Sequence, residues 1–443
     1  MVGLWTDALL WGLVLVMALG LAAARSRPEL KRPFAKLAEH PSGVVALAVL
    51  LFFLSVALLD SVHYQKSGGE VLSVLDTLLT PLRDGQEKTY SAPFASQLYS
   101  SEFMETDTGE PVWGRPRLQH GGAHLSDEDH HIQDIALKLL AACGRYLGLL
   151  AIIALFVWVS WRGLQQRWRD LPALRWATWT ILAQLALALV LWDVSHYYHV
   201  LGTDMVGEDV LYQTVKSIRT GWVIGALTTL IMLPLAIGFG ILAGFFGGWV
   251  DDVIQYLYTT LNSIPGVLLI AAAILLVQVH MANHPENYTS LQVRADTRLL
   301  FLCLILGVTS WTGLCRLLRA ETLKLREMGY VQAAFALGVK PYRILLRHIL
   351  PNVMHIVIIS VALDFSALVL AEAVLSYINI GVDPVTYSWG NMINGARLEL
   401  AREPLVWWSL MAAFCLMFTL VLAANLFADS VRRAFDPREA EHG

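Results

Sequence analysis

Residues 330–352 read Tyr-Val-Gln-Ala-Ala-Phe-Ala-Leu-Gly-Val-Lys-Pro-Tyr-Arg-Ile-Leu-Leu-Arg-His-Ile-Leu-Pro-Asn and separate two strongly apolar runs. A membrane protein that places such a polar, basic segment between two spans usually presents it to a soluble partner. Residues 331–336 favour a helix, Gly338 suits a helix end, and Pro341 suits the first turn of another helix. We therefore predict a short helix, a turn, and a second helix that continues into the next span at Pro351.

The composition is that of a polytopic membrane protein. Of 443 residues, 56% are hydrophobic and 15% are charged, whereas ordinary soluble domains carry about 25% charged residues. A span needs roughly 20 mostly apolar residues, because a helix rises about 1.5 Å per residue across a hydrocarbon core of about 30 Å. We expect an all-α membrane protein with about nine transmembrane helices, at roughly 4–24, 43–62, 143–163, 175–193, 220–246, 252–279, 298–318, 352–378 and 404–428.

The distribution of Lys and Arg sets the expected orientation, because these residues are retained on the cytoplasmic side. Segments 25–42, 162–175 and 316–348 are basic, whereas 63–134 is acidic. With nine spans the three basic segments fall on one side, which places the N-terminus outside and the C-terminus in the cytoplasm. The first run, 4–24, is expected to be a retained anchor, since its basic residues follow it, the reverse of a signal peptide.

Several motifs of catalysis and metal binding are absent from the sequence. There is no Gly-Lys dipeptide and hence no phosphate-cradling P-loop, nor a His-Glu-x-x-His or Gly-x-Ser-x-Gly pattern. The four cysteines form no Cys-x-x-Cys pair, so neither a zinc site nor a disulfide framework is indicated. A solvated loop is favoured over a metal site for His120, His124, His130 and His131. We expect no enzymatic activity, cofactor, metal site or nucleic-acid partner for this chain.

The segment 330–352 resembles the cytoplasmic coupling motif of importer-type ABC transporter permeases. That motif reads Glu-Ala-Ala, three residues, Gly, and a later Ile-Leu-Pro; here Gln332 replaces the Glu, while Gly338 and Ile349-Leu350-Pro351 keep their places. The resemblance implies docking on a soluble ATPase, against the alternative of an ordinary cytoplasmic loop. The residues expected to make this coupling are Gln332, Ala333, Ala334, Gly338, Arg343 and Pro351.

A second match lies at 199–210, His-Val-Leu-Gly-Thr-Asp-Met-Val-Gly-Glu-Asp-Val, and is similar to a segment of the dipeptide and oligopeptide permease branch. That branch usually carries Arg where this chain has Glu208, which is a charge reversal. Gly202 permits a tight turn, and Thr203 and Asp204 can cap a helix start. We interpret the segment as a structural gate or brace rather than as a direct substrate contact.

Further resemblance to this branch is found at 245–251, 263–266, 372–391 and 425–438. Asp364 and Glu372 lie in one apolar run, where an ionisable group is a functional candidate; Glu372 can equally be a capped interfacial carboxylate. Pro265 predicts a kink, which either lines the pathway or serves packing alone. The expected pathway or gate residues are Gly202, Thr203, Asp204, Asp209, Pro265, Asp364 and Glu372.

The resemblance covers residues 199–438 and, weakly, the run 43–62. On these motifs the chain is identified as a member of the peptide/nickel ABC importer family, in its second-permease (C-type) branch, whose core has six spans. The expected organisation is an extra N-terminal span with a basic linker (1–42), a first core span (43–62), an extracytoplasmic insert (63–142), an inserted pair of spans (143–198), the permease core (199–438) with a cytoplasmic coupling loop (319–351), and a short tail (439–443).

The resemblance implies a permease subunit of an ATP-driven importer in a bacterial inner membrane, with peptides as the expected cargo. Its implied partners are a second permease, two ATPase subunits that bind ATP and Mg²⁺, an external substrate-binding protein and the lipid membrane. Two other classes stay open: an ATP-independent channel or secondary carrier, and a structural or sensory subunit that recruits a soluble partner. Substrate uptake that depends on ATP would separate the first class from both.

Overall fold

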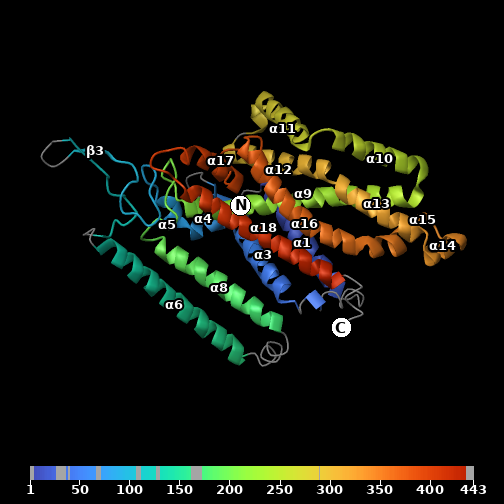
Figure 1. Ribbon diagram of the computed structural model, residues 1–443, viewed down its shortest axis with the longest axis horizontal. Helices are drawn as coiled ribbons and strands as arrows, with labels where there is room; N and C mark the ends of the chain where they lie inside the picture. The colour runs from blue at the N-terminus through green and yellow to red at the C-terminus, as the bar shows by residue number, and fades with distance from the viewer. Residues whose placement is uncertain are drawn as a thin grey trace.

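The computed structural model describes residues 4–25, 36–37, 40–65, 71–105, 111–125, 130–160, 172–288 and 290–435, and most of them are helical (Figure 1). The helices outside the region 63–125 are α1 (Trp5–Arg25), α3 (Pro41–Asp60), α6 (His131–Ser160), α8 (Pro172–Val194), α9 (Val210–Phe246), α10 (Gly248–Ser263), α11 (Gly266–Asn283), α12 (Leu291–Ser310), α13 (Thr312–Arg326), α14 (Gly329–Ala336), α15 (Pro341–Ile344), α16 (Leu350–Tyr377), α17 (Trp389–Glu399) and α18 (Trp408–Phe435).

Eight helical stretches in the described part of the chain are long and apolar enough to cross a membrane. They comprise α3, α6, α8, α9, α11, α12 with α13, α15 with α16, and α18. In addition, α1 contains a shorter apolar helix, Trp5–Leu19. The predicted all-α polytopic membrane fold is therefore confirmed.

The expected single span over 252–279 is wrong. The chain is helical in α10 and α11 but breaks between them at Ile264 and Pro265. Proline has no N–H to donate to the preceding turn and its ring clashes with that turn, so α10 ends before it. Of these two helices, α11 alone has the length and apolar composition of a span.

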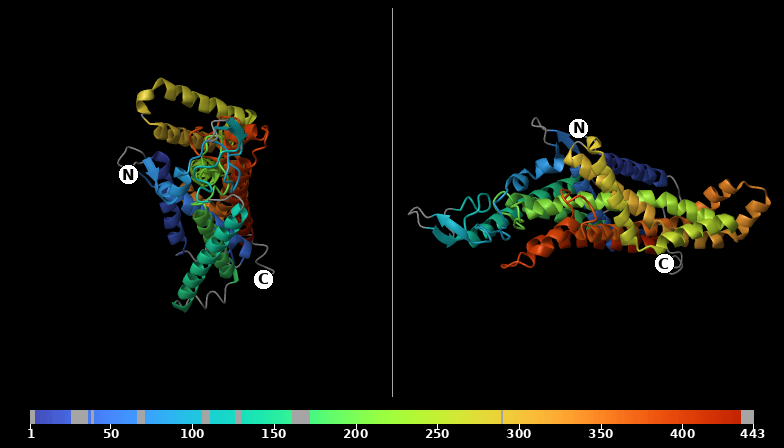
Figure 2. Two further views of the ribbon diagram at one scale, coloured as in Figure 1. Left: turned by 90° about the vertical axis from the view of Figure 1, so that its left-hand side faces the viewer. Right: turned by 90° about the horizontal axis from the view of Figure 1, so that it is seen from above.

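The central helix of the bundle is α9, which contacts α3, α10, α12, α13 and α16 (Figure 2). Two of its glycines let α13 approach closely. A Cβ added at Gly240 would lie 2.8 Å from the carbonyl oxygen of Cys315, and one at Gly244 would lie 2.7 Å from that of Arg319. Small residues at a helix–helix contact let two membrane helices pack backbone to backbone.

Three helices lie at the periphery of this bundle. The α8 helix packs on α3 and α6 packs on α8, so α6 is the outermost (Figure 1). Because α6 begins at His131, its first turns extend into the expected insert 63–142. The α1 helix contacts α9 and α12, and it does so near its start: Leu10 is fully buried, whereas Leu15 is 62% exposed.

The described residues between 63 and 125 (63–65, 71–105 and 111–125) form a small lobe. Its elements are β1 (His63–Gln65), β2 (Val71–Ser73), α4 (Val74–Leu78), α5 (Thr80–Asp84), β3 (Glu102–Glu105) and β4 (Pro111–Gly114). The strands form two antiparallel pairs, β1 with β2 and β3 with β4. The β3–β4 side of the lobe and α14 lie at opposite ends of the long axis (Figures 1 and 2), which we name the lobe end and the α14 end.

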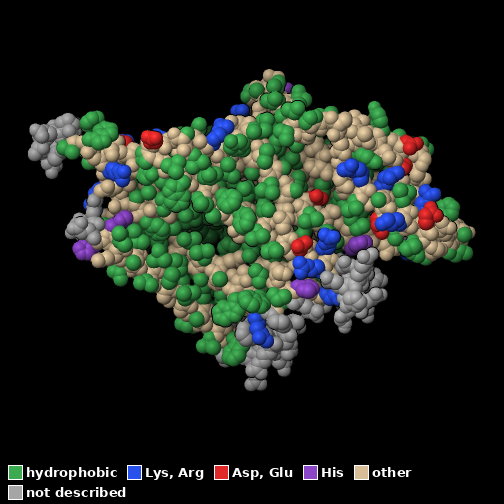
Figure 3. Space-filling view, viewed as in Figure 1, with side chains coloured by type: hydrophobic (Ala, Val, Ile, Leu, Met, Phe, Trp, Pro, Cys, Tyr) green, Lys and Arg blue, Asp and Glu red, His purple; other side chains and the backbone are tan. Residues whose placement is uncertain are grey.

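Hydrophobic side chains cover much of the middle of the molecule, whereas charged side chains gather towards the α14 end (Figure 3). The exposed apolar residues include Leu140 (70%), Ile152 (67%) and Leu276 (72%). Such exposure is costly in water but favourable in hydrocarbon. The surface therefore agrees with a bundle whose middle is embedded in a membrane and whose two ends protrude into water.

Candidate transport pathway and coupling segment

The segment 330–351 folds into a helix, a turn and a second helix. The first helix, α14, ends in a Schellman motif, in which the N–H of Val339 donates to the carbonyl of Ala334 (3.1 Å) and the N–H of Gly338 to that of Phe335 (3.0 Å). Gly338 has a φ of +74°, a conformation that glycine adopts without steric cost. After α15, one π-helical turn (Leu345–Ile349) leads into α16. The chain therefore reverses direction here as the residue types predict.

One face of α14 anchors the segment and the other face is exposed. Val331 is 2% exposed and packs into the apolar core between α9, α13 and α16, where Ala334 joins it. Residues three apart share a helix face, so Ala334 is partly buried on the same side as Val331. The exposed surface is instead dominated by Phe335 (65%) and Leu337 (83%).

The polar residues of the segment make local contacts. Gln332 Nε2 donates to Glu327 Oε2 (2.9 Å), a bond that the ionised Glu of the related motif could not make, because a carboxylate only accepts. Arg343 Nε donates to the hydroxyl of Tyr342 (3.2 Å), and both side chains are exposed. Pro351, in the first turn of α16, is exposed as well.

Two arginines of α13 fix the base of the segment. Arg319 donates two hydrogen bonds to Asp251 of α10, from Nε to Oδ1 (2.5 Å) and from Nη2 to Oδ2 (2.6 Å). These bonds lower the pKa of Asp251 and are among the strongest that side chains form. Arg326 Nη1 donates to the carbonyl of Phe245, near the end of α9 (3.2 Å). The helix leading into α14 is thus tied to α9 and α10.

At the lobe end, Gly202 and Thr203 lock the lobe to the bundle. Thr203 is fully buried: its Oγ1 accepts from the N–H of Ser91 (2.7 Å), and its carbonyl accepts from Trp408 Nε1 (2.9 Å). Gly202 has a φ of +72°, and an added Cβ would lie 2.4 Å from the carbonyl oxygen of Ser91. The geometry supports the brace interpretation, because neither residue has surface to offer a substrate.

Glu208 stands where the related branch usually has Arg, and it accepts hydrogen bonds from two neighbouring residues. Gln213 Nε2 donates to Glu208 Oε2 (2.9 Å) and to Asp204 Oδ2 (2.7 Å), and the Tyr387 hydroxyl donates to Glu208 Oε1. Burial and the neighbouring Asp204 carboxylate raise the pKa of Glu208. Asp209 caps α9, accepting at Oδ1 from the N–H groups of the next turn.

His199 joins two buried carboxylates of the lobe and the bundle. Its Nδ1 lies 2.7 Å from Asp209 Oδ2, and its Nε2 lies 3.4 Å from Glu87 Oε1. Burial lowers the pKa of His199, but the two carboxylates outweigh it and raise the pKa to about 9. Burial raises the pKa of Glu87, yet the nearby His199 ring and hydrogen bonds from three backbone N–H groups bring it down to about 2.

This triad makes stability depend on pH. The stabilisation from His199 is complete below its ordinary pKa of 6.5 and is lost as the pH rises through about 9. The stabilisation from Glu87 is complete above pH 4.5, its ordinary pKa, and is lost as the pH falls towards 2. We expect the thermal midpoint of the purified protein, followed by tryptophan fluorescence, to decline between pH 6.5 and 9, with a loss of roughly 3 kcal/mol at most. In His199→Gln the decline over this range should largely vanish; an unchanged decline would contradict the assignment.

The other expected pathway residues are not gathered into one site. Pro265 lies exposed at the α10–α11 break. Asp364 is half-buried in α16 and forms no hydrogen bond or ion pair with a residue that the structure describes. Glu372 is 2% exposed and accepts a hydrogen bond from Ser376 (2.7 Å), so it lies packed within the bundle. None of the three adjoins the Gly202–Asp209 brace.

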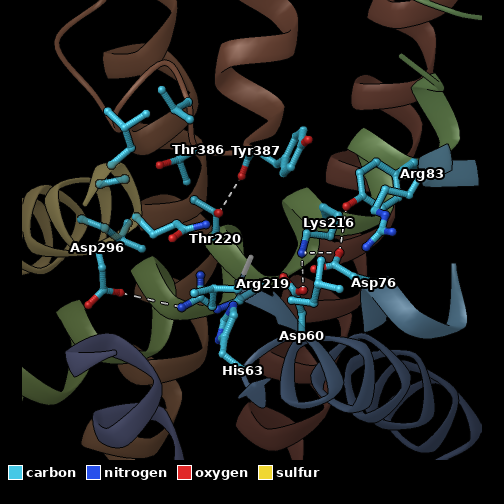
Figure 4. Close-up of a pocket in the computed structure, with 18 residues that line it drawn as sticks. Asp60, His63, Asp76, Arg83, Lys216, Arg219, Thr220, Asp296, Thr386 and Tyr387 are labelled. Carbon is cyan, nitrogen blue, oxygen red and sulfur yellow. Dashed lines mark hydrogen bonds and ion pairs between the residues drawn. The ribbon is translucent and has the colours of Figure 1, made fainter. Parts of the chain in front are cut away.

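A cavity of about 390 Å³ near the lobe end contains charged residues that the sequence did not single out (Figure 4). On one side Lys216 Nζ lies 2.6 Å from Asp60 Oδ1 and 2.8 Å from Asp76 Oδ1. Lys216 is followed three residues later by Arg219, so both cations leave the same face of α9. The wall also includes Thr386 and Tyr387, from the loop before α17.

On the other side of the cavity, Arg219 receives its partners from α1 and α12. Its Nη2 lies 2.5 Å from Asp7 Oδ1 and 3.8 Å from Asp296 Oδ1. Asp7 Oδ2 lies 2.8 Å from His63 Nδ1. Asp296 in turn accepts from the backbone N–H of Trp5 (2.9 Å), at the start of α1. A signal was present in the sequence, since Lys216, Arg219, Asp60 and Asp296 all flank apolar runs.

Helices of membrane-spanning length, a charged cavity among them and an exposed apolar segment at one end are features of a polytopic membrane protein. A family model described as binding-protein-dependent transport system inner membrane component matches residues 236–441. Over 239 residues the chain is 32% identical to the oligopeptide transport system permease protein OppC of Mycobacterium tuberculosis (strain ATCC 25618 / H37Rv), covering 54% of this chain and 76% of that protein. The chain belongs to this family of inner membrane transport components.

Two further relatives carry related descriptions. The chain is 30% identical over 243 residues to the dipeptide transport system permease protein DppC of Lactococcus lactis subsp. cremoris, covering 55% of this chain and 65% of that protein. It is 28% identical over 240 residues to the glutathione transport system permease protein GsiD of Pectobacterium atrosepticum, covering 54% of this chain and 73% of that protein. The chain thus spans slightly less than two thirds of the length of the Lactococcus protein.

Proposed function

We propose that this chain is a permease subunit of an ATP-driven importer for peptides and forms half of a translocation pathway. The observation that carries the proposal is the exposed surface of α14, where Phe335 and Leu337 stand out at the charged end of the molecule. Large apolar side chains on a rigid, polar end indicate a protein partner. The relatives' descriptions as dipeptide, oligopeptide and glutathione permeases support peptides as the cargo.

The partner at this surface is one of two ATPase subunits, which bind ATP and Mg²⁺ themselves. A second permease completes the pathway, and a substrate-binding protein delivers the peptide at the lobe end; the family's description as binding-protein-dependent supports this last partner. The residues proposed to couple to the ATPase are Gln332, Ala333, Ala334, Gly338, Arg343 and Pro351, with Phe335 and Leu337 added from the structure.

The α14 end is proposed to face the cytoplasm of a bacterium and the lobe end its outside. Basic residues support this orientation, since Arg319, Arg326, Lys340, Arg343 and Arg347 all lie at or near the α14 end. The N-terminus then lies outside and the C-terminus inside. In this arrangement α3 and residues 199–438 form the transport core, while α1, α6 and α8 are additions to it.

Movement of the ATPases reaches the pathway through rigid connections. When ATP draws two ATPase subunits together, a partner bound to α14 displaces it as a body. The segment continues through α15 and the π-helical turn into α16, and Arg319 links α13 to α10 through Asp251. The displacement is thereby shared by helices on both sides of α9, as alternation between an outward and an inward opening requires.

The proposal is tested by purification from the native membrane in mild detergent, followed by reconstitution of the captured complex in liposomes. We expect a second permease and ATPases with P-loops to co-purify, and peptide uptake that requires ATP. As a matched pair, Leu337→Asp at the exposed surface should release the ATPases, whereas Leu398→Asp, 68% exposed on α17, should not. Recovery of the chain without ATPases, or uptake driven by a proton gradient, would favour a channel or carrier instead.

A further inference from the structure

An aromatic pair stands exposed on the β3–β4 hairpin of the lobe. Phe103 and Trp113 lie opposite each other on the two antiparallel strands, and their rings meet edge to face with centroids 4.6 Å apart. Phe103 is 73% exposed and Trp113 is 61% exposed. Large aromatic side chains that stay exposed on a water-facing surface are typical of protein interfaces, because a partner removes much apolar area from water by covering them.

The pair occupies only one face of the hairpin. Successive residues of a strand point to opposite faces, so Met104 and Val112 lie on the other side, where the end of Met104 fills the space beside Gly114. Val112 is 50% exposed. The hairpin therefore presents a distinct aromatic face, and Val112 offers an exposed apolar residue on the opposite face for comparison.

A positive charge lies next to the aromatic pair in the chain. Arg115 directly follows β4 and is exposed, and no carboxylate in the described part of the chain pairs with it. Together with Tyr99 and with His131, the first residue of α6, it lines a pocket of about 320 Å³. None of the described residues that line this pocket is Asp or Glu. An acidic side chain that entered the pocket would therefore form charge-assisted hydrogen bonds with the guanidinium group.

The segment that leads into the hairpin is attached to the membrane bundle. The Tyr99 hydroxyl donates to the carbonyl of Leu405 (3.0 Å), and the Tyr99 ring meets that of Trp408 edge to face, with centroids 4.9 Å apart. Trp408, at the start of α18, also donates to the carbonyl of Thr203 in the Gly202–Asp209 brace. A partner held by the hairpin is thereby connected to α18 and to the brace through direct contacts.

The position of the hairpin indicates the direction from which a partner arrives. The hairpin lies at the lobe end of the long axis, beyond the membrane-spanning helices (Figures 1 and 2). Lipid surrounds the apolar middle of the bundle, and a second permease has to place its helices beside these helices to share a pathway with them. Neither lipid nor those helices reach the hairpin, so its partner comes from the aqueous side at the lobe end.

We propose that the aromatic face of this hairpin, with Arg115 beside it, is a docking surface for the substrate-binding protein, which meets it with an apolar patch and an acidic side chain. The inference rests on the proposed function, in which such a protein delivers the cargo at the lobe end; the family's description as binding-protein-dependent supports this occupant. The family model begins at residue 236, so the hairpin lies outside the segment that it matches. We therefore expect the surface to favour this chain's own binding protein over those of its relatives.

A first experiment identifies the occupant. The photoreactive amino acid p-benzoylphenylalanine replaces Trp113 in the complete transporter in its native cells and, in a second strain, replaces Val112. Illumination should link position 113, and not position 112, to one protein that binds peptides when it is purified. An adduct with the second permease, with lipid or with another copy of the chain would overturn the proposal, and so would the absence of any adduct.

A second experiment measures the affinity of the cross-linked protein, purified and fluorescently labelled, for the complete transporter in lipid nanodiscs. Trp113→Ser and Arg115→Glu should each raise the dissociation constant about tenfold or more, as is common when an aromatic or arginine anchor is lost from an interface. Both side chains are exposed, so the lobe should fold in either variant. Val112→Ser is the matched control and should bind like the wild type. Unchanged affinity in Trp113→Ser or Arg115→Glu, or an equal loss in Val112→Ser, would overturn the proposal.

The same preparations separate this proposal from the proposed function. ATP hydrolysis without the binding protein should be the same in the wild type, Trp113→Ser and Arg115→Glu, because the hairpin lies at the opposite end from α14. Peptide uptake by the wild type that does not require ATP would refute the permease function itself. ATP-driven uptake that depends on a binding protein, combined with unchanged affinity in the two hairpin variants, would refute the docking surface alone.

Discussion

Replacement of Gly338 by valine is expected to reduce ATP-driven uptake by about tenfold or more, while the chain stays assembled in the membrane. Gly338 has a φ of +74°, and an added Cβ would meet no atom within 4 Å. The effect therefore comes from the backbone and not from a clash. For a residue other than glycine this conformation costs about 1–2 kcal/mol of free energy, and for a β-branched residue it costs more. Since about 1.4 kcal/mol is a factor of ten in an equilibrium, the turn rearranges and α14 no longer leads into α15 correctly.

The same segment contains a matched control. Gly329, at the start of α14, likewise has open space around an added Cβ, but its φ is not positive, so Gly329→Val should retain most of the uptake. Reconstituted transporters should be compared for uptake and ATPase activity side by side. Uncoupling appears as ATP hydrolysis that persists without uptake. If Gly338→Val transported as well as Gly329→Val, the turn geometry would have no part in coupling.

Removal of the Asp7 carboxylate is expected to destabilise the protein by about 3–5 kcal/mol, the cost of leaving a buried charge without its partner. Arg219 has a side-chain exposure of 11% and loses its shortest contact in Asp7→Ala. Replacing both members by apolar residues removes the unpaired charge, so the double variant Asp7→Ala/Arg219→Met should recover most of this loss. Thermal unfolding of the purified chain in detergent measures both effects.

An exposed ion pair serves as the reference for this cycle. Arg145 is 61% exposed where it contacts Asp193, and exposed pairs contribute about 0–1 kcal/mol. Asp193→Ala should accordingly lower the free energy of unfolding only slightly, whether or not Arg145→Met is also present. A loss in Asp7→Ala no larger than in Asp193→Ala would show that α1 does not help to hold the transport core together.

The features that local chemistry determines could be predicted from the sequence. The polar segment between two apolar runs, Gly338 at a helix end and Pro341 at a helix start all appear as expected, because each depends on a few neighbouring residues. The family assignment followed from the same segment and is confirmed by the relatives. The break at Pro265 was also foreseeable as a kink, but its depth, a full separation of α10 from α11, was not.

The features that depend on tertiary packing could not be predicted from the sequence. The inward face of Ala334 is set by a core assembled from several helices, which the alanine pattern does not show. Likewise, Arg219 contacts both Asp7 and Asp296, although the sequence separates these residues widely. Charges beside apolar runs were visible, but nothing in their spacing indicated which of them would meet.

The Asp7–Arg219 contact has a consequence for biosynthesis. The two residues are 212 positions apart, and at about 5–20 residues per second a ribosome needs roughly 10–40 s to make the intervening chain. During that interval Asp7 of α1 has already been made, but its partner Arg219 has not. The start of α1 can therefore take its final place only after α9 and the Asp296 region of α12 have been made, although α1 itself is synthesised well before them.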